Sequence, residues 1–382
     1  MQPVAVAFSQ HFTTFFLFAL SLLFTGLSLN YRSRFWIFLP LALVAAAGHL
    51  FTMEYFLGLE AIRVIYIYFL VSKKERKWQQ ALRQSLLIWL PYLIMLVLYL
   101  FWRLAIYPSQ IQGSLPNDPV ILKQLFLEPG NNLLVLLTRI TKDSIYLMVN
   151  SWVNTIAIED IDFRAKATLF SWGVGLVLAV IAACWLMISS KNQSDEPILD
   201  RFYSQGIVLG IGSIVFGGLP VWLIARQITE GKWSDRFSLA PMIGAVLIIV
   251  IVIDWLIRTN RQKQVLLAIL LAMSIAFQIR NVNKYRLDWD IQRNCYWQVY
   301  WRIPALESGT AFVAPNIPSG KIADYAAAYG INIMYADENL NAATPYWFFT
   351  QRDEGSSFAK LEPGYEIKYQ LRSIQFSGTT SN

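Results

Sequence analysis

The stretch that decides the fold is "FWIFLPLALVAAAGHLFTMEYFLGLEAIRVIYIYFLV", which runs from Phe35 to Val71. As one helix it would be about 55 Å long at about 1.5 Å per residue, whereas the hydrocarbon core of a bilayer is only about 30 Å thick. We therefore predict two membrane spans, residues 35–52 and 56–71, with a tight reversal at "TMEY" (52–55) between them.

The composition of the whole chain agrees with a membrane setting. Of its 382 residues, 55% are hydrophobic and 15% are charged, and the mean hydropathy is +0.42. A soluble domain carries about 25% charged residues, so this chain has too few to cover a water-exposed body. Apolar runs of about 18 residues or more recur, and each is long enough to cross a bilayer. The sequence predicts an all-α polytopic integral membrane bundle of about eight helices, at residues 8–30, 35–52, 56–71, 85–106, 167–189, 204–226, 240–257 and 264–280.

The distribution of charge predicts the orientation of the spans. The formal net charge is +7, but Lys and Arg gather at the ends of the apolar runs, so the basic balance requires no nucleic acid partner. Loops 31–34, 72–83 and 258–263 are short and basic, which is typical of cytoplasmic loops. Residues 191–201 lie on the same side by alternation, and both termini then fall outside. We expect a multi-pass protein of the bacterial plasma (inner) membrane.

One long connection between spans, residues 107–166, is predicted to lie on the outer side. It contains "NNLLVLLTRITKDSIYLMVNSW" (131–152), whose apolar residues have helical spacing but which also carries charges. Two interpretations remain open: an amphipathic helix on the outer leaflet, or a structural lid packed over the bundle.

The last part of the chain changes character after Arg280. Residues 281–382 have no membrane-length apolar run. An aromatic-rich helix at 284–303 is expected to leave the membrane, followed by a further helix at 321–330. Strands are predicted from β-branched and aromatic content in "GTAFVAP", "INIMYA", "YWFFTQ" and "YEIKYQLRSIQFSG". The predicted domains are a transmembrane domain, 1–280, and a small extracytoplasmic α/β domain, 281–382.

Small residues in one apolar run predict close helix packing. "SQGIVLGIGSIVFGGLP" (204–220) holds Gly206 and Gly210 in a G-x-x-x-G pattern, which in membrane helices usually marks a contact between helices. Pro220 is expected to break or kink this span toward its outer end.

Ionisable residues inside the apolar runs mark a candidate site, because charges at bilayer depth are costly and tend to face a bundle interior or a water-filled cavity. Glu60 and Arg63 are spaced i, i+3 and can pair on one helix face, which fits a structural ion pair as well as a functional one. Glu54 lies at the predicted outer turn, near His49. It is a candidate acid/base group or metal ligand, or alternatively an interfacial carboxylate in water.

A second charged group is predicted at the same outer face. Asp235 and Arg236, in "WSDRF" (233–237), come just before the seventh predicted span. The planar guanidinium of Arg236 suits a lipid-linked phosphate, because it binds oxyanions bidentately. An ordinary interfacial anchor is the alternative interpretation. We expect Glu54, Glu60 and Arg63 to face an outward polar cavity, with Asp235 and Arg236 on its rim.

No cofactor is evident from the sequence. Two histidines and two cysteines form no metal-ligand cluster, and P-loop, G-x-S-x-G and G-x-G-x-x-G motifs are absent. The acidic "IEDID" (158–162) could bind a divalent cation, although a solvated turn is the simpler account.

Four stretches of the chain resemble the C-type glycosyltransferases, polytopic enzymes that use polyprenyl-phosphate sugars. These stretches are "QPVAVAFSQHFTTFFLFALSLLF", "LFTMEYFLGLEAIR", "DRFSLAPMIGA" and "YWQVYWRIPALESGTAFV". The "TMEYFLGLE" turn also resembles a turn after the middle helices of the related protein O-mannosyltransferases. The resemblance implies many membrane helices and a small exterior domain at the C-terminal end.

The opening of the chain departs from that family pattern. The family's catalytic acid lies in the first exterior loop, and residues 1–34 contain no such acidic loop. The resemblance therefore implies either a fragment or a diverged member without transferase chemistry.

Three hypotheses for function follow. The first is a membrane glycosyltransferase-like protein that handles a polyprenyl-phosphate-linked sugar at the outer face. Its candidate catalytic residues are Glu54 and Glu60, and its candidate substrate-binding residues are His49, Arg63, Asp235 and Arg236. The second is a transporter or lipid-handling protein with the same charges along a polar pathway. The third is a non-catalytic membrane scaffold.

Overall fold

The computed structural model describes residues 9–73, 75, 77–106, 120–156, 166–190, 200–229, 234–257, 259–307, 309–314, 324–335, 346–350, 366–369 and 372–375. The acidic motif 158–162, residues 107–119 and most of loop 191–201 lie outside these ranges. The chain divides into two compact units, Met1–Phe277 and Gln278–Asn382, and each is described by itself.

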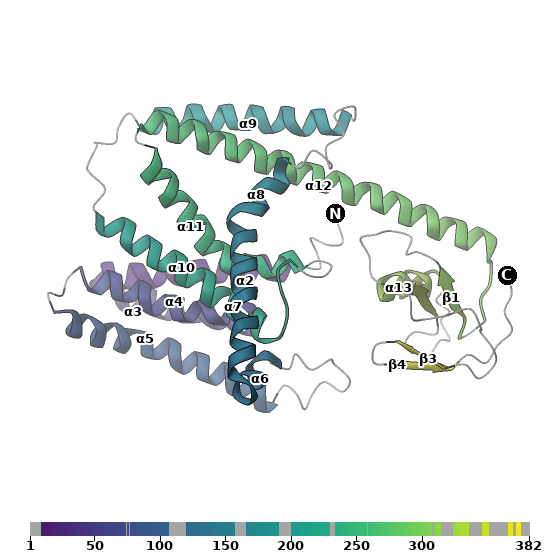
Figure 1. The fold of residues 1–382 in the computed structure, drawn as a ribbon, viewed down its shortest axis with the longest axis horizontal. Coiled ribbons are helices and arrows are strands. Elements are labelled where there is room, and N and C mark those ends of the chain that lie inside the picture. Colours follow the sequence, from purple (N-terminus) through teal and green to yellow (C-terminus); the bar gives the residue numbers. More distant parts are fainter. Residues whose placement is uncertain are drawn as a thin grey trace. The chain divides into compact units, whose positions relative to one another are not determined.

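The first unit is built from helices (Figure 1). In chain order they are α2 (Ser9–Asn30), η1 (Arg32–Arg34), α3 (Phe35–Thr52), the 3-10 helix η2 (Glu54–Leu59), α4 (Glu60–Val71), α5 (Trp78–Phe101), the π-helix η3 (Trp102–Ile106), α6 (Val120–Leu127), α7 (Pro129–Ile145), η5 (Tyr146–Asn150), α8 (Ser151–Val153), η6 (Asn154–Ile156), α9 (Lys166–Ser190), α10 (Asp200–Leu223), η8 (Ser234–Ser238), α11 (Leu239–Leu256) and the start of α12 (Asn260–Arg302).

Seven helices in the described part of the chain are long and apolar enough to cross a membrane, so the protein is a multi-pass membrane protein. They correspond to all the predicted spans except 56–71. That segment is helical too, but α4 itself has 12 residues and covers about 18 Å at about 1.5 Å per residue. An eighth crossing stays a prediction.

Two predicted boundaries were wrong. Helix α5 begins at Trp78, so the second half of the predicted loop 72–83 is helix; "WQQALR" consists largely of good helix formers. The predicted span at 264–280 and helix at 284–303 form one helix, α12, of 43 residues. Because neither Pro nor Gly occurs between Asn260 and Arg302, nothing in the sequence interrupts its backbone hydrogen bonds.

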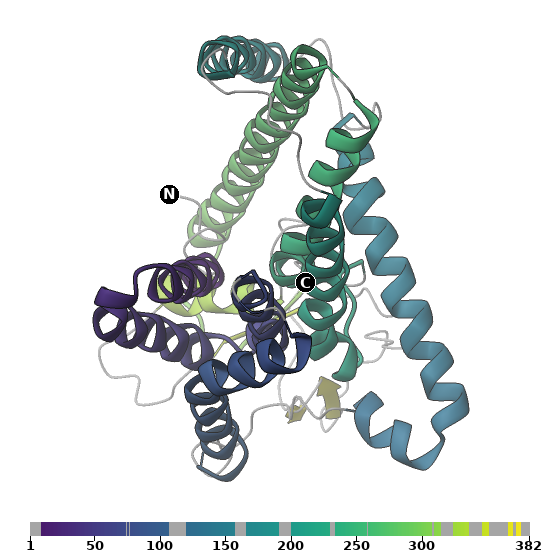
Figure 2. The same cartoon turned by 90° about the vertical axis from the view of Figure 1, so that its left-hand side faces the viewer.

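The predicted small-residue packing is confirmed between α10 and α11. A Cβ added at Gly210 would lie 2.6 Å from a carbon of Ile248, and one added at Gly244 would lie 2.1 Å from the carbonyl oxygen of Gly210. The two backbones approach closely because these positions carry no side chain. Seen from the side in Figure 2, α2 to α5 (purple to blue) group together, and α7 flanks α10 and α11.

The predicted amphipathic segment 131–152 packs on the bundle. It forms α7 and continues through η5, and Figure 1 shows α7 crossing α10. Leu147 belongs to an apolar cluster with Ile214 and Val221 of α10. Asp143 of α7 is fully buried and accepts hydrogen bonds from Trp222 Nε1 at 2.7 Å and from the Ile228 backbone N–H at 3.1 Å. These contacts support the interpretation of this segment as a lid.

In its described residues, the second unit contains the end of α12, the helix α13 (Asp324–Met334) and four short strands. β1 (Ala311–Ala314) pairs in parallel with β2 (Trp347–Thr350), and β3 (Glu366–Tyr369) pairs antiparallel with β4 (Arg372–Gln375). The strands lie within the stretches predicted to be extended.

One predicted strand in this unit is helical. "INIM" (331–334) forms the last turn of α13, because Ala327, Ala328 and Ile331 share a helix face that is buried against Phe348. Asn332 fixes the same turn. Its Nδ2 donates to the carbonyl oxygen of Ala328 at 2.7 Å and to that of Tyr346 at 2.8 Å. Packing and hydrogen bonding outweigh the β propensity of two isoleucines.

Candidate functional site

The site is organised by the break between α3 and α4. Met53 leaves the helical region, with φ −154° and ψ 123°, and ends α3; η2 then leads into α4. Gly58 of η2 lies against α10, where an added Cβ would be only 1.8 Å from the carbonyl oxygen of Phe216. That carbonyl is one turn before Pro220, which has no N–H to donate to it. The predicted reversal at 52–55 is therefore a short interruption held on α10.

Three of the predicted residues meet in one buried ion cluster. Arg63 donates to Glu60 through Nε to Oε2 at 2.6 Å and through Nη2 to Oε1 at 2.8 Å. His49 Nε2 lies 2.8 Å from Glu60 Oε1. The predicted pairing of Glu60 with Arg63 is confirmed, and His49 adds a third member.

Helices α2 and α5 complete this cluster. Arg63 Nη1 donates to Thr25 Oγ1 at 3.1 Å, and Thr25 donates to the carbonyl oxygen of Ser21 at 2.7 Å. The hydroxyl of Tyr92 lies 2.8 Å from Thr25 Oγ1, and the Arg63 guanidinium lies 4.3 Å from the centre of the Tyr92 ring. The cluster therefore joins α2, α3, α4 and α5 through one carboxylate and one guanidinium.

The expectation that Glu60 and Arg63 face an outward cavity was wrong. The exposed fraction is 1% for Glu60 and 0% for Arg63 and His49, so no space large enough for water adjoins them. The physical reason is that the carboxylate and the guanidinium satisfy each other's hydrogen bonds. This bidentate pairing lets both charges be buried without water. The Nδ1 atom of His49 is buried and has no hydrogen-bond partner, which fits a neutral ring that donates from Nε2 to the carboxylate.

Glu54 lies apart from the buried cluster, at the start of η2. Arg103, in the π-helix η3 after α5, donates a hydrogen bond from Nε to Glu54 Oε2 at 2.9 Å. Both side chains remain accessible: 27% of the Arg103 side chain and 30% of the Glu54 side chain are exposed. Glu54 is thus a carboxylate at the surface of the bundle with a basic partner that the sequence reasoning did not identify.

Tyr55 connects Glu54 to the second predicted charge group. Its ring meets that of Phe237 edge to face at 4.7 Å between centroids, and the Arg236 guanidinium lies 4.8 Å from the centre of the same Phe237 ring. Burial raises the pKa of the Tyr55 phenol, and the positive charges of Arg236 and Arg226 oppose this rise. Arg236 therefore lies on the same side of the bundle as Glu54.

Arg226 is placed here by the end of α10. Ala225 adopts a left-handed conformation, with φ 61°. The backbone N–H of Ala225 donates a hydrogen bond to the carbonyl oxygen of Trp222. The backbone N–H of Arg226 donates one to the carbonyl oxygen of Val221. This is the Schellman ending of a helix, which turns the chain sharply. The exposed Arg226 then adjoins the segment that Asp143 holds through Ile228.

The six predicted residues thus separate into two groups. His49, Glu60 and Arg63 form the buried cluster, and Glu54 and Arg236 lie around Tyr55, with the exposed Asp235 next to Arg236 in η8. We call the residues Glu54, Tyr55, Arg103, Arg226 and Arg236 the outer group.

Four contributing residues were missed from the sequence. Arg103 and Arg226 each follow an apolar run, which is the signal that could have found them, but such arginines are usually interfacial anchors. Thr25 carries no signal of this kind, because a threonine hydroxyl in a membrane helix commonly bonds to the backbone of its own helix. Tyr92 carries none either, since it is one of several aromatic residues in an apolar run.

No group of three or more His, Cys, Asp or Glu side chains in the described ranges is arranged to hold a metal ion. Comparisons with protein-family models, with curated proteins and with solved structures found no match to this chain.

Proposed function

We propose that the protein handles a polyprenyl-phosphate-linked sugar at the outer face of a bacterial inner membrane, in the manner of a C-type glycosyltransferase. The observation that supports this most directly is the outer group. Among the described residues of this site, Arg103, Arg226 and Arg236 bring three positive charges, against the partly buried Glu54 and the exposed Asp235. An excess of guanidinium groups at a lipid–water boundary suits a phosphate oxyanion.

In this proposal Arg236 and Arg226 hold the donor phosphate. The polyprenyl chain lies in the bilayer beside the bundle. Because Tyr55 and Phe237 form an apolar wall beside the guanidinium of Arg236, its charge is partly shielded from water, which strengthens its attraction to an anion. We also propose that residues 281–382 form an α/β domain on the extracytoplasmic side of the membrane.

In this proposal Glu54 carries out the proton transfer. In a transfer step its carboxylate accepts the proton of an acceptor hydroxyl while the hydroxyl oxygen attacks the anomeric carbon of the sugar. The bond from that carbon to the phosphate oxygen breaks, and the polyprenyl phosphate leaves with its charge on the arginines. Arg103 donates a hydrogen bond from Nε to Oε2 of this carboxylate and orients it.

Glu60 does not take part in this step. It has three hydrogen bonds from charged or polar partners and no exposed surface, so it cannot reach a substrate in this conformation. We assign Glu60, Arg63 and His49 the task of fixing α4, and therefore η2 with Glu54, against α2, α3 and α5.

Binding of decaprenyl phosphate to the purified protein in detergent tests the proposal. We expect measurable binding of the phosphate and none of decaprenol, which has the same chain without the charge. In the double variant Arg226→Gln, Arg236→Gln the dissociation constant should rise about tenfold or more, since the loss of one charge-assisted contact is worth about 1.5–3 kcal/mol.

Arg83→Gln is the matched control, because Arg83 is exposed at the other end of the bundle, in the first turns of α5. Its dissociation constant should equal that of the wild type. Equal affinity in the double variant and the wild type would contradict the proposal, as would equal binding of decaprenol and decaprenyl phosphate.

A further inference from the structure

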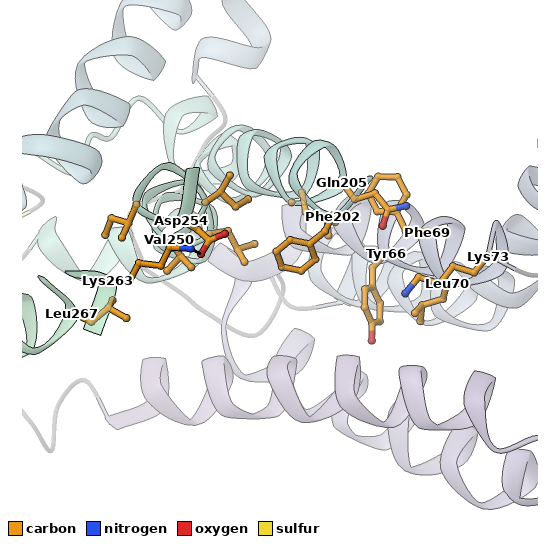
Figure 3. A pocket seen from close by; sticks show the side chains of 15 residues that line it. Tyr66, Phe69, Leu70, Lys73, Phe202, Gln205, Val250, Asp254, Lys263 and Leu267 are labelled. Atoms are coloured by element: carbon orange, nitrogen blue, oxygen red, sulfur yellow. Dashed lines mark hydrogen bonds and ion pairs between the residues drawn. The ribbon is translucent and has the colours of Figure 1, made fainter. Parts of the chain in front are cut away.

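A cavity lies in the first unit, away from the outer group. It is lined by the end of α4, the start of α10, the end of α11 and the start of α12 (Figure 3). Its volume is about 500 Å³, within the range of about 300–1,000 Å³ that is usual for small-molecule sites. None of the candidate residues discussed above lines it.

The wall of this cavity is mainly apolar. Most of its lining comes from aliphatic and aromatic side chains, among them Tyr66, Phe69, Leu70, Phe202, Val250 and Leu267. Such a lining suits a hydrocarbon chain, because it offers few groups that could replace the hydrogen bonds of water. Phe202 is 59% exposed and Leu267 is 39% exposed, so the cavity opens toward the surface of the bundle.

Two lysines flank the apolar lining. Figure 3 shows Lys73 on the α4 side and Lys263 on the α12 side. Lys263 Nζ donates to Asp254 Oδ1 at 2.5 Å, and Tyr203 donates to Asp254 Oδ2 at 2.6 Å. A lysine ammonium has three donors, so Lys263 retains N–H groups for an anion while Asp254 holds it in place. Lys73 is exposed.

The position of the cavity along the helices adds a second argument. Three of the four lining helix ends adjoin the basic loops 72–83 and 258–263, and the start of α10 follows loop 191–201; the sequence predicts all three loops to be cytoplasmic. An apolar cavity between membrane helices with lysines at its rim matches the pattern of basic pockets that bind acidic lipid head groups on that side.

We propose that this cavity binds an anionic glycerophospholipid. One acyl chain lies along Phe69, Phe202 and Leu267, and the negatively charged head group is attracted by the lysine ammonium groups that flank this lining. A neutral phospholipid lacks the net charge that these lysines recognise, and a free phosphate lacks the chain that fills the apolar part. The site is independent of the outer group and of any transferase activity.

Native mass spectrometry of the detergent-solubilised protein tests this proposal with phosphatidylglycerol and phosphatidylcholine of identical acyl chains. The wild type should bind phosphatidylglycerol at least tenfold more tightly than phosphatidylcholine. Lys73→Gln with Lys263→Gln should reduce that preference to about twofold or less. Leu267→Trp, which fills the cavity without changing charge, should weaken both lipids.

Lys77→Gln provides the matched control, since Lys77 is exposed in the same basic loop and does not line the cavity. Its lipid preference should equal that of the wild type. Lys73→Gln alone leaves the ion pair between Lys263 and Asp254 in place and keeps the test valid if the double variant unfolds; it should lower the preference by about threefold.

Three results would overturn the proposal: equal binding of the two lipids, an equal loss of preference in Lys77→Gln and Lys73→Gln, or competition by glycerol phosphate as effective as that by the whole lipid. The variants Arg226→Gln and Arg236→Gln should leave phosphatidylglycerol binding unchanged. Failure of this site is therefore distinguishable from failure of the outer group.

Discussion

A carboxylate and a guanidinium that are removed from water together need partners for nearly all of their polar atoms. Glu60 and Arg63 meet this condition through each other and through His49 and Thr25. The Tyr92 ring covers the face of the guanidinium and adds a cation–π contact. At the scale of single residues, the cluster is stable as a whole and vulnerable to the loss of any one charge.

This asymmetry gives a prediction for Glu60 and Arg63. Glu60→Gln and Arg63→Gln should each destabilise the protein by about 3–5 kcal/mol, because each leaves an uncompensated buried charge. The double substitution should cost less than the larger single one. The measurement is the yield of monodisperse protein in detergent together with its melting temperature. Additive losses in the two single variants and the double variant would mean that the two charges do not compensate each other.

Residue-scale prediction from the sequence succeeded where spacing along one helix decides the contact. The i, i+3 spacing of Glu60 and Arg63 places them on one face, and the structure pairs them. The bond between Glu54 and Arg103 joins positions 49 residues apart and depends on how α5 packs on the reversal. Helical periodicity carries no information about such a contact.

At the scale of elements, the break between α3 and α4 depends on Gly58. η2 can lie on α10 because Gly58 has no Cβ, and the carbonyl oxygen of Phe216 that it approaches is one that Pro220 leaves without its helical N–H donor. In "TMEYFLGLE", Gly58 is therefore as important to the structure of the break as Glu54 and Glu60.

Gly58→Ala should destabilise the protein by about 1–3 kcal/mol, since a methyl group has no room there and η2 must move away from α10. Decaprenyl phosphate binding should weaken as well, because Glu54 and Tyr55 belong to η2. Thermal unfolding in detergent measures the first effect and lipid binding the second.

Gly173→Ala is the control for that experiment. Gly173 lies in α9, and a Cβ added there meets nothing within 4 Å. Alanine is the better helix former by about 0.5–1 kcal/mol, so stability should stay the same or rise. A melting temperature of Gly58→Ala equal to that of Gly173→Ala would refute the close approach of η2 to α10.

Element boundaries were predictable where a helix-breaking residue or an abrupt change of polarity occurs. The reversal after Thr52 agrees with the prediction, but the change of polarity beyond Arg280 does not end α12, which continues to Arg302. Burial of Asp143 in the lid could not be foreseen, since its partners Trp222 and Ile228 lie about 80 residues away in sequence.

At the scale of the whole molecule, the basic loops predict that residues 72–77 and the outer group lie on opposite sides of the membrane. Single cysteines in a background with Cys184 and Cys295 replaced by Ser test this. A cysteine at Lys77 should resist a membrane-impermeant maleimide in intact cells, and one at the exposed Asp235 should react. The reverse labelling pattern would invert the topology and place the outer group in the cytoplasm.

The central claim is that the outer group, and not the buried cluster, contacts a lipid-linked phosphate. Photo-crosslinking with a polyprenyl phosphate that carries a diazirine next to its phosphate, followed by peptide mapping, addresses it directly. We predict crosslinks to residues 54–59 and 226–237, and their loss in the double variant Arg226→Gln, Arg236→Gln. Crosslinks confined to α4 around Glu60 and Arg63, or an unchanged pattern in the double variant, would contradict the account.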